Sequence, residues 1–162
     1  MHRVMVTAVL CLLIGLIQPV ALDTVQDATM PYFLQISTSE ARDQYYKIHG
    51  NSRDLTKQQL EDVLRKWAKE QGEEVSEEFE KYVESESKFA LKRFNVLSQR
   101  IESSSASEQV KELLINMLKY QLLKNVTIRA YDEHISAFMD GCPKNVQDEA
   151  TELWNKIDPA NI

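Results

Sequence analysis

Cysteine, glycine and proline are all scarce in this 162-residue sequence. It contains two cysteines, four glycines and four prolines. Two cysteines cannot supply the disulfide framework that stabilises many small secreted domains. The glycines form no phosphate-binding loop, and the G-x-S-x-G motif of serine hydrolases is also absent. These shortages exclude disulfide-stapled scaffolds and several common classes of enzyme.

Basic residues and histidine are also in short supply. Lysine and arginine number 19 against 25 aspartates and glutamates, which gives a formal net charge of −6. Nucleic acids and anionic lipid surfaces both select basic proteins, so we expect neither as a partner. No H-x-x-x-H zinc spacing occurs, and we expect His49 and His134 to face solvent on helices. We therefore predict that the protein is not an enzyme.

Long apolar runs are absent after the first 21 residues. Val4–Ile17 is apolar, follows a short basic lead and is too short to span a bilayer comfortably. Residues 1–21 therefore resemble a cleaved secretory signal peptide, with a membrane anchor or buried helix as the alternative. Their removal takes away Arg3 and Cys11, which moves the formal charge to −7 and leaves Cys142 as the single cysteine. The mature chain is expected to be secreted, extracellular and free of membrane attachment.

Helical periodicity dominates the remaining sequence, most clearly between Leu55 and Gly72. Apolar residues recur there at helical spacing on one face: Leu60, Val63, Leu64 and Trp67. Thr56 and Gln59 have the spacing of a capping box, and Gly72 supplies a residue at which helices commonly stop. This stretch is predicted to be a helix with Trp67 in the core.

Similar patterns predict a long helix over Ser76–Glu102 and further helices after it. Capping-box spacings occur at Ser37–Glu40 and Ser105–Glu108, and Pro143 suits the first turn of a last helix. A break near Asn125 is expected, although one bent helix across that point is the alternative. The fold prediction is an all-α, elongated bundle of five or six helices with Ser76–Glu102 as its spine.

The segment before these helices, residues 22–37, shows no sustained period and is predicted to be an extended N-terminal arm. Within it, Pro31-Tyr32-Phe33-Leu34 forms an apolar cluster. We expect its aromatic rings to pack onto the helices, since exposed aromatic clusters are uncommon on soluble monomers. The alternative is a peptide that binds a partner.

Three stretches together resemble the nematode SXP/RAL family of small secreted proteins. They are LTKQQLEDVLRKWAKEQG followed by FEKYVESE, the PYFL element at residues 31–34, and PKNVQDE at residues 143–149. The resemblance implies an α-helical, antigen-like or allergen-like secreted protein, with a family domain over residues 38–158 described as cation-binding. This sequence departs from the family in its single proline at the N-terminal element and in the serine-rich entry near Ser105.

For the cation site that the resemblance implies, the best carboxylates are those of Glu73, Glu74 and Glu77. No EF-hand loop is present, so binding of Mg²⁺ or Ca²⁺ would be weak. The alternative explanation is that acidic residues favour a helix start because they interact well with the helix dipole.

Two other residues are candidates for chemistry. Cys142 is a free thiol beside a helix start, a position that suits a reactive thiol or a disulfide between two molecules. The simpler alternative is that Cys142 is buried as a small apolar residue. Asn125-Val126-Thr127 is the single N-glycosylation sequon, so Asn125 is a candidate glycosylation site.

Three functions remain open on these grounds. The first is an extracellular interaction or antigen protein that binds an unknown protein partner through its helical surface. The second is a carrier of a small apolar ligand, such as a lipid or fatty acid, held within the bundle by aromatic residues such as Trp67, Phe94 and Phe138. The third is weak binding of a divalent cation.

Overall fold

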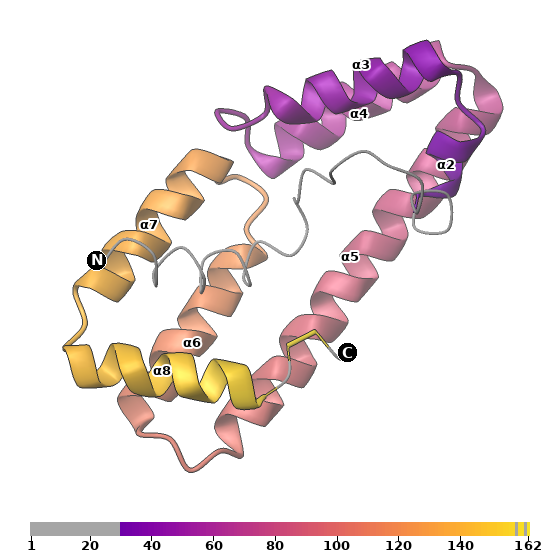
Figure 1. Ribbon diagram of the computed structural model, residues 1–162. Helices are drawn as coiled ribbons and strands as arrows, with labels where there is room; N and C mark the ends of the chain where they lie inside the picture. The colour runs from indigo at the N-terminus through magenta and orange to yellow at the C-terminus, as the bar shows by residue number, and fades with distance from the viewer. Residues whose placement is uncertain (1–29, 158, 161) are drawn as a thin grey trace. The chain divides into compact units, whose positions relative to one another are not determined.

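The computed structural model describes residues 30–157, 159–160 and 162, and over these residues the protein is all-α (Figure 1). Seven helices occur in this part of the chain: α2 (Tyr32–Gln35), α3 (Ser39–Gly50), α4 (Lys57–Glu70), α5 (Glu73–Glu102), α6 (Glu108–Gln121), α7 (Ile128–Asp140) and α8 (Lys144–Lys156). The all-α prediction is confirmed. The predicted signal peptide and residues 22–29 of the predicted arm lie outside the described residues. None of the described helices is long and apolar enough to cross a membrane.

The start of α5 lies three residues before the predicted one. Gly72 ends the preceding helix with a φ of +113°, a backbone conformation that favours glycine, and α5 begins at the next residue. The N–H of Ser76 donates to the carbonyl of Gly72, so Ser76 lies inside the first turn and does not cap it. Glu73 and Glu74 occupy that turn, where negative charge interacts well with the helix dipole.

The chain between α6 and α7 is not helical, so the predicted break is confirmed and the single bent helix is wrong. Lys124, Asn125 and Val126 form bends, and Thr127 makes an isolated antiparallel bridge with Thr56. The amide of Gln58 also donates to the carbonyl of Lys124 at 3.0 Å. Backbone pairing with Thr56 and with the first turn of α4 therefore replaces helical hydrogen bonds here.

The predicted arm differs from the structure at α2, where Tyr32–Gln35 form one helical turn. Pro31 precedes the turn with a φ of −53°, which suits a helix start. The carbonyl of Pro31 accepts from the amide of Leu34, and the hydroxyl of Ser37 donates to the carbonyl of Phe33. The expected packing is confirmed for Phe33, which is buried together with Leu34, whereas the ring of Tyr32 is 55% exposed.

The chain forms two compact units, and α5 contributes to both. The N-terminal unit comprises residues 30–88 and 124–129, and the C-terminal unit comprises residues 89–123 and those from 130 onward. Each unit has its own apolar core. No side chain of α5 between Phe79 and Leu97 is buried.

Aromatic rings form the core of the N-terminal unit around Phe33. Its ring centroid lies 5.5 Å from that of Tyr45, 6.2 Å from Trp67, 5.2 Å from Phe79 and 5.1 Å from Tyr82. The first three of these contacts are edge-to-face, an arrangement that aromatic pairs prefer. A segment far from α4 and α5 in sequence thus supplies the central residue of their core.

His49 is half-buried, contrary to the prediction that it faces solvent. Its ring lies 4.6 Å from that of Tyr45, and its Nε2 is buried without a hydrogen-bond partner among the described residues. Burial lowers the pKa of His49 below its ordinary value, because the charged imidazolium would lose hydration. His134, in contrast, is exposed as predicted.

We expect the N-terminal unit to lose stability as the pH falls from 7 to 5. A pKa lowered by folding means that the unfolded chain binds the proton more tightly, so protonation of His49 favours unfolding. Urea denaturation at several pH values checks this, and His49→Gln should flatten the profile in that window. His134→Gln is the matched control and should keep the parent profile, and identical profiles for all three proteins would contradict the expectation.

The C-terminal unit has an aliphatic core built from α6, α7, α8 and the end of α5, with α6 packed on α8. Its buried side chains are Leu97, Ile101, Val110, Leu113, Leu114, Met117, Leu118, Ile135, Met139, Val146, Ala150, Leu153, Trp154 and Ile157. The predicted Ser105–Glu108 capping box does not form. Ser107 precedes α6 instead, and its amide and hydroxyl donate to the Glu149 carboxylate at 2.7 and 2.9 Å.

Candidate binding site

An open groove of about 520 Å³ lies on the N-terminal unit between α3 and α4. Its lining consists of Gln44, Lys47, Ile48, Asn51, Leu55, Val63, Lys66, Trp67 and Glu70. The volume falls within the range of about 300–1,000 Å³ that is typical of sites for small molecules. Four of these side chains are apolar, and the polar ones include three with a charge. Most of the surface that these side chains expose to the groove is apolar, which suits a ligand that is apolar over most of its length.

Val63 belongs to the predicted apolar face of α4, but in the structure it lines the groove. Val63 is 41% exposed, whereas Leu60, Leu64 and Trp67 on the same helix are buried. The apolar face of α4 is therefore wider than the surface that α3 covers, and Val63 lies at its uncovered edge.

Trp67 belongs to both the core and the groove. Its ring packs edge-on against Phe33 and lies 5.3 Å from the ring of Tyr45, and only 4% of its surface is exposed. Its Nε1 is buried and has no hydrogen-bond partner among the described residues. An unpaired buried donor costs about 1–3 kcal/mol, so burial of this N–H group offsets part of the stability gained by burying the ring.

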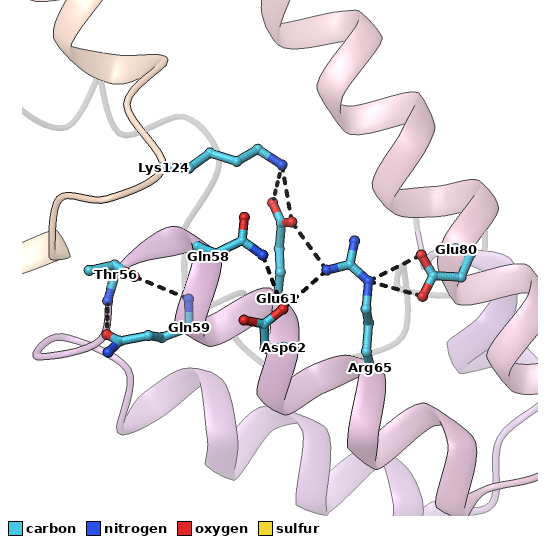
Figure 2. A network of polar contacts seen from close by, with 8 residues as sticks. All are labelled: Thr56, Gln58, Gln59, Glu61, Asp62, Arg65, Glu80 and Lys124. Atoms are coloured by element: carbon cyan, nitrogen blue, oxygen red, sulfur yellow. Dashed lines mark hydrogen bonds and ion pairs between the residues drawn. The ribbon is translucent and has the colours of Figure 1, made fainter.

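Side chains of α4 that do not line the groove form an ion-pair network, in which carboxylates surround Arg65 (Figure 2). The Nε of Arg65 donates to both oxygens of Glu80, at 3.0 and 3.2 Å. Its Nη1 lies 3.6 Å from Glu61 and 3.4 Å from Asp62. Because three carboxylates surround one guanidinium, the negative charge of this cluster is already partly neutralised within the protein.

Lys124 completes the network from the segment between α6 and α7. Its Nζ lies 2.8 and 3.0 Å from the two carboxylate oxygens of Glu61 (Figure 2). A second pair joins the same regions, since Nε of Arg129 donates to Asp54 at 2.6 Å. That pairing lowers the pKa of Asp54. The network therefore attaches residues 124–129 to the rest of the N-terminal unit.

A family model described as "SXP/RAL-2 family protein Ani s 5-like, metal-binding domain" matches residues 5–148. The chain belongs to the SXP/RAL-2 family. The resemblance read from the sequence is thereby confirmed, over most of the chain. Searches of curated proteins and of solved structures gave no match.

The metal-binding description of the SXP/RAL-2 domain can be compared with the carboxylates of this chain. Among the described residues, no group of three or more histidines, cysteines, aspartates or glutamates is placed to hold a metal ion. The densest carboxylate cluster is occupied by Arg65 and Lys124. The side chains described here therefore do not fit a preformed metal centre.

The predicted cation residues Glu73, Glu74 and Glu77 are all exposed on the first two turns of α5. We expect any binding of Mg²⁺ or Ca²⁺ there to be weak, with dissociation constants of about 10⁻⁴–10⁻³ M or higher. Calorimetric titration of the parent and of a variant with all three glutamates changed to glutamine checks this. Sub-micromolar binding by the parent, or equal heats for both proteins, would contradict the predicted site.

Other predicted site residues lie in the SXP/RAL-2 domain away from the groove. Cys142 is partly buried beside the core of the C-terminal unit, and its Sγ contacts the carbonyl of Phe138 at 3.3 Å. Asn125 is exposed in its bend, which leaves the sequon accessible. Neither Phe94 nor Phe138, proposed as ligand-binding aromatics, lines the α3–α4 groove.

Sequence reasoning did not identify Lys47, Lys66 or Val63 as groove residues. None of these residues departs from the usual pattern of a helix. The groove exists only because α3 leaves part of the α4 face uncovered. The one available signal was the width of the apolar stripe on α4, which includes Val63 beside Leu64 and Trp67.

Proposed function

We propose that this chain is a secreted, non-enzymatic binding protein of the SXP/RAL-2 family that holds an apolar ligand in the groove between α3 and α4. The groove itself carries the proposal, since it combines a suitable volume with an apolar lining. The apolar run within residues 1–21 supports secretion. The absence of catalytic motifs from the sequence supports binding as the activity.

The driving force for binding lies in apolar surface that folding leaves in water. Val63 keeps 41% of its surface exposed within the groove. Removing apolar surface from water contributes about 25 cal/mol for each square ångström. A ligand that covers Val63 and its apolar neighbours would therefore gain free energy that α3 does not provide.

This proposal differs from a carrier with its ligand inside the bundle, because the groove is open on the surface of one unit. It also places binding apart from the carboxylate network, whose charges are engaged by Arg65 and Lys124. The interaction with an extracellular protein remains compatible with it, since an apolar side chain of a partner could occupy the same surface.

Val63→Gln tests the groove. We expect it to weaken binding of N-phenyl-1-naphthylamine, a neutral apolar fluorescent probe, by about tenfold, because one apolar contact is replaced by a hydrated amide. Leu91→Gln is the matched control: Leu91 is 55% exposed on α5 and does not line the groove. Both substitutions are on exposed positions, so folding should be preserved in each.

The fluorescence of the bound probe gives the affinities of the parent and the two variants. No enhancement with the parent, or equal loss in both variants, would contradict a ligand site in this groove. Expression of the full chain in secretory eukaryotic cells checks secretion separately. The protein should appear in the medium with its N-terminus just after Ala21, whereas retention of an uncleaved chain in cells would refute that part.

A further inference from the structure

The groove between α3 and α4 carries positive charge in a chain that is acidic overall. Lys47 lies in the last turn of α3 and Lys66 lies on α4, and both line the groove together with one acidic residue, Glu70. Both lysines are exposed, and neither forms an ion pair with a described residue. The whole sequence has 25 acidic residues against 19 basic ones, so two lysines against one glutamate is a local reversal.

This reversal favours a ligand that carries a negative charge. An ammonium group on a lysine attracts a carboxylate, while the apolar lining excludes a ligand that is charged along its length. Val63 provides the most exposed apolar surface in the groove, and the partly buried Ile48 and Leu55 lie beside it. A molecule with a long hydrocarbon chain and a single anionic end matches both features.

We propose that the occupant of the groove is a free long-chain fatty acid. Its hydrocarbon chain covers Val63 and the exposed parts of Ile48 and Leu55, and its carboxylate lies near Lys47 and Lys66. This inference rests on the proposed binding function and names the ligand class for the same site. It adds a carboxylate requirement that the apolar lining alone does not impose.

Burial of the hydrocarbon chain and attraction between the carboxylate and the lysines contribute differently to the affinity, and this difference decides what should be measured. Extending a buried hydrocarbon chain by two methylenes raises the binding affinity by about tenfold, because each buried CH₂ group raises it by about three- to fourfold. A charge pair exposed to solvent contributes less, about fivefold or below, and is screened by salt. The hydrocarbon chain of the ligand therefore determines most of the affinity. The two lysines determine the preference for a fatty acid over the matching alcohol.

The test compares decanoate, dodecanoate and 1-dodecanol as calorimetric titrants at low ionic strength, below their aggregation concentrations. The parent should bind dodecanoate about tenfold more tightly than decanoate and about fivefold more tightly than dodecanol. Lys47→Met with Lys66→Met keeps most of the apolar stems and should remove the preference for the acid. Lys69→Met with Lys92→Met removes the same charge outside the groove and should leave the preference intact.

The outcomes separate this inference from the proposed function. Equal affinity of the parent for dodecanol and dodecanoate would overturn the fatty-acid inference and leave an apolar binding groove. Equal loss of the acid preference in both double variants would also overturn it, because the charge effect would then be general. Failure of the parent to bind any of the three titrants would overturn both. Binding to phosphatidylcholine vesicles in preference to dissolved dodecanoate would identify a membrane surface as the occupant and refute the free fatty acid.

Discussion

Trp67→Ala should lower the free energy of unfolding of the N-terminal unit by about 3–5 kcal/mol, the usual cost of deleting a buried aromatic ring. Trp67 is 4% exposed and packs against Phe33 and Tyr45, so the surrounding rings cannot close the cavity without losing their own edge-to-face contacts. Urea denaturation followed by circular dichroism measures the loss.

Val63→Ala is the matched control for this effect on the same helix. Val63 is 41% exposed, so its truncation should change stability by no more than about 0.5 kcal/mol. Similar denaturation midpoints for Trp67→Ala and Val63→Ala would show that Trp67 does not stabilise the core in the way its burial indicates.

Trp154→Ala should destabilise the C-terminal unit by a similar amount, about 3–5 kcal/mol. Trp154 is 1% exposed among aliphatic side chains, and the guanidinium of Arg93 lies 5.9 Å from its ring centroid. Its Nε1 is buried without a partner among the described residues, so Trp154→Phe should cost less than Trp154→Ala. Equal costs for the two variants would contradict this ordering.

The two tryptophans of the sequence make these experiments specific, since each lies in a different core. After Trp154→Ala, the remaining fluorescence comes from Trp67 and reports on the N-terminal unit. If the two cores unfold separately, that fluorescence should keep its transition while circular dichroism shows an earlier loss of helix. A fluorescence transition that moves with the circular dichroism would mean that the chain unfolds as one cooperative body.

The prediction of α4 from sequence succeeded because all its signals are local. The Thr56 hydroxyl accepts from the Gln59 amide at 3.1 Å, and the Gln59 side chain accepts from the Thr56 amide at 2.8 Å. Gly72 adopts the expected positive φ. Each of these interactions joins residues within a few positions of one another, so spacing alone identifies them.

Interactions between distant residues explain the predictions that failed. Ser107 begins α6 with Glu149 as its acceptor, 42 positions away, and no spacing rule refers to such a partner. Thr38, one residue after the expected Ser37, caps α3, because the Ser37 hydroxyl donates to the carbonyl of Phe33. Local patterns identify residues suited to capping, and tertiary contacts decide which of them is used.

The candidate site was less predictable than the fold for the same reason. A helical pattern shows that Val63 is on the apolar face of α4, but only the position of α3 determines whether that face is covered. The ion pairs of the carboxylates also depend on residues that are distant in sequence. Glu61 and Glu80 are far apart in sequence from Lys124 and from one another, and the structure pairs them with basic residues that charge counting cannot assign.

The long helix α5 has a further consequence for how the protein opens. Isolated helices fray from their ends, because terminal turns have the fewest hydrogen bonds. In α5 the ends contribute Phe79 and Leu97 to separate cores, while no side chain between them is buried. Backbone amides near Ser87 should therefore exchange their hydrogens with solvent sooner than those near Phe79 or Leu97, the reverse of ordinary fraying. A protease should then cut the middle of α5 before it cuts near Phe79 or Leu97.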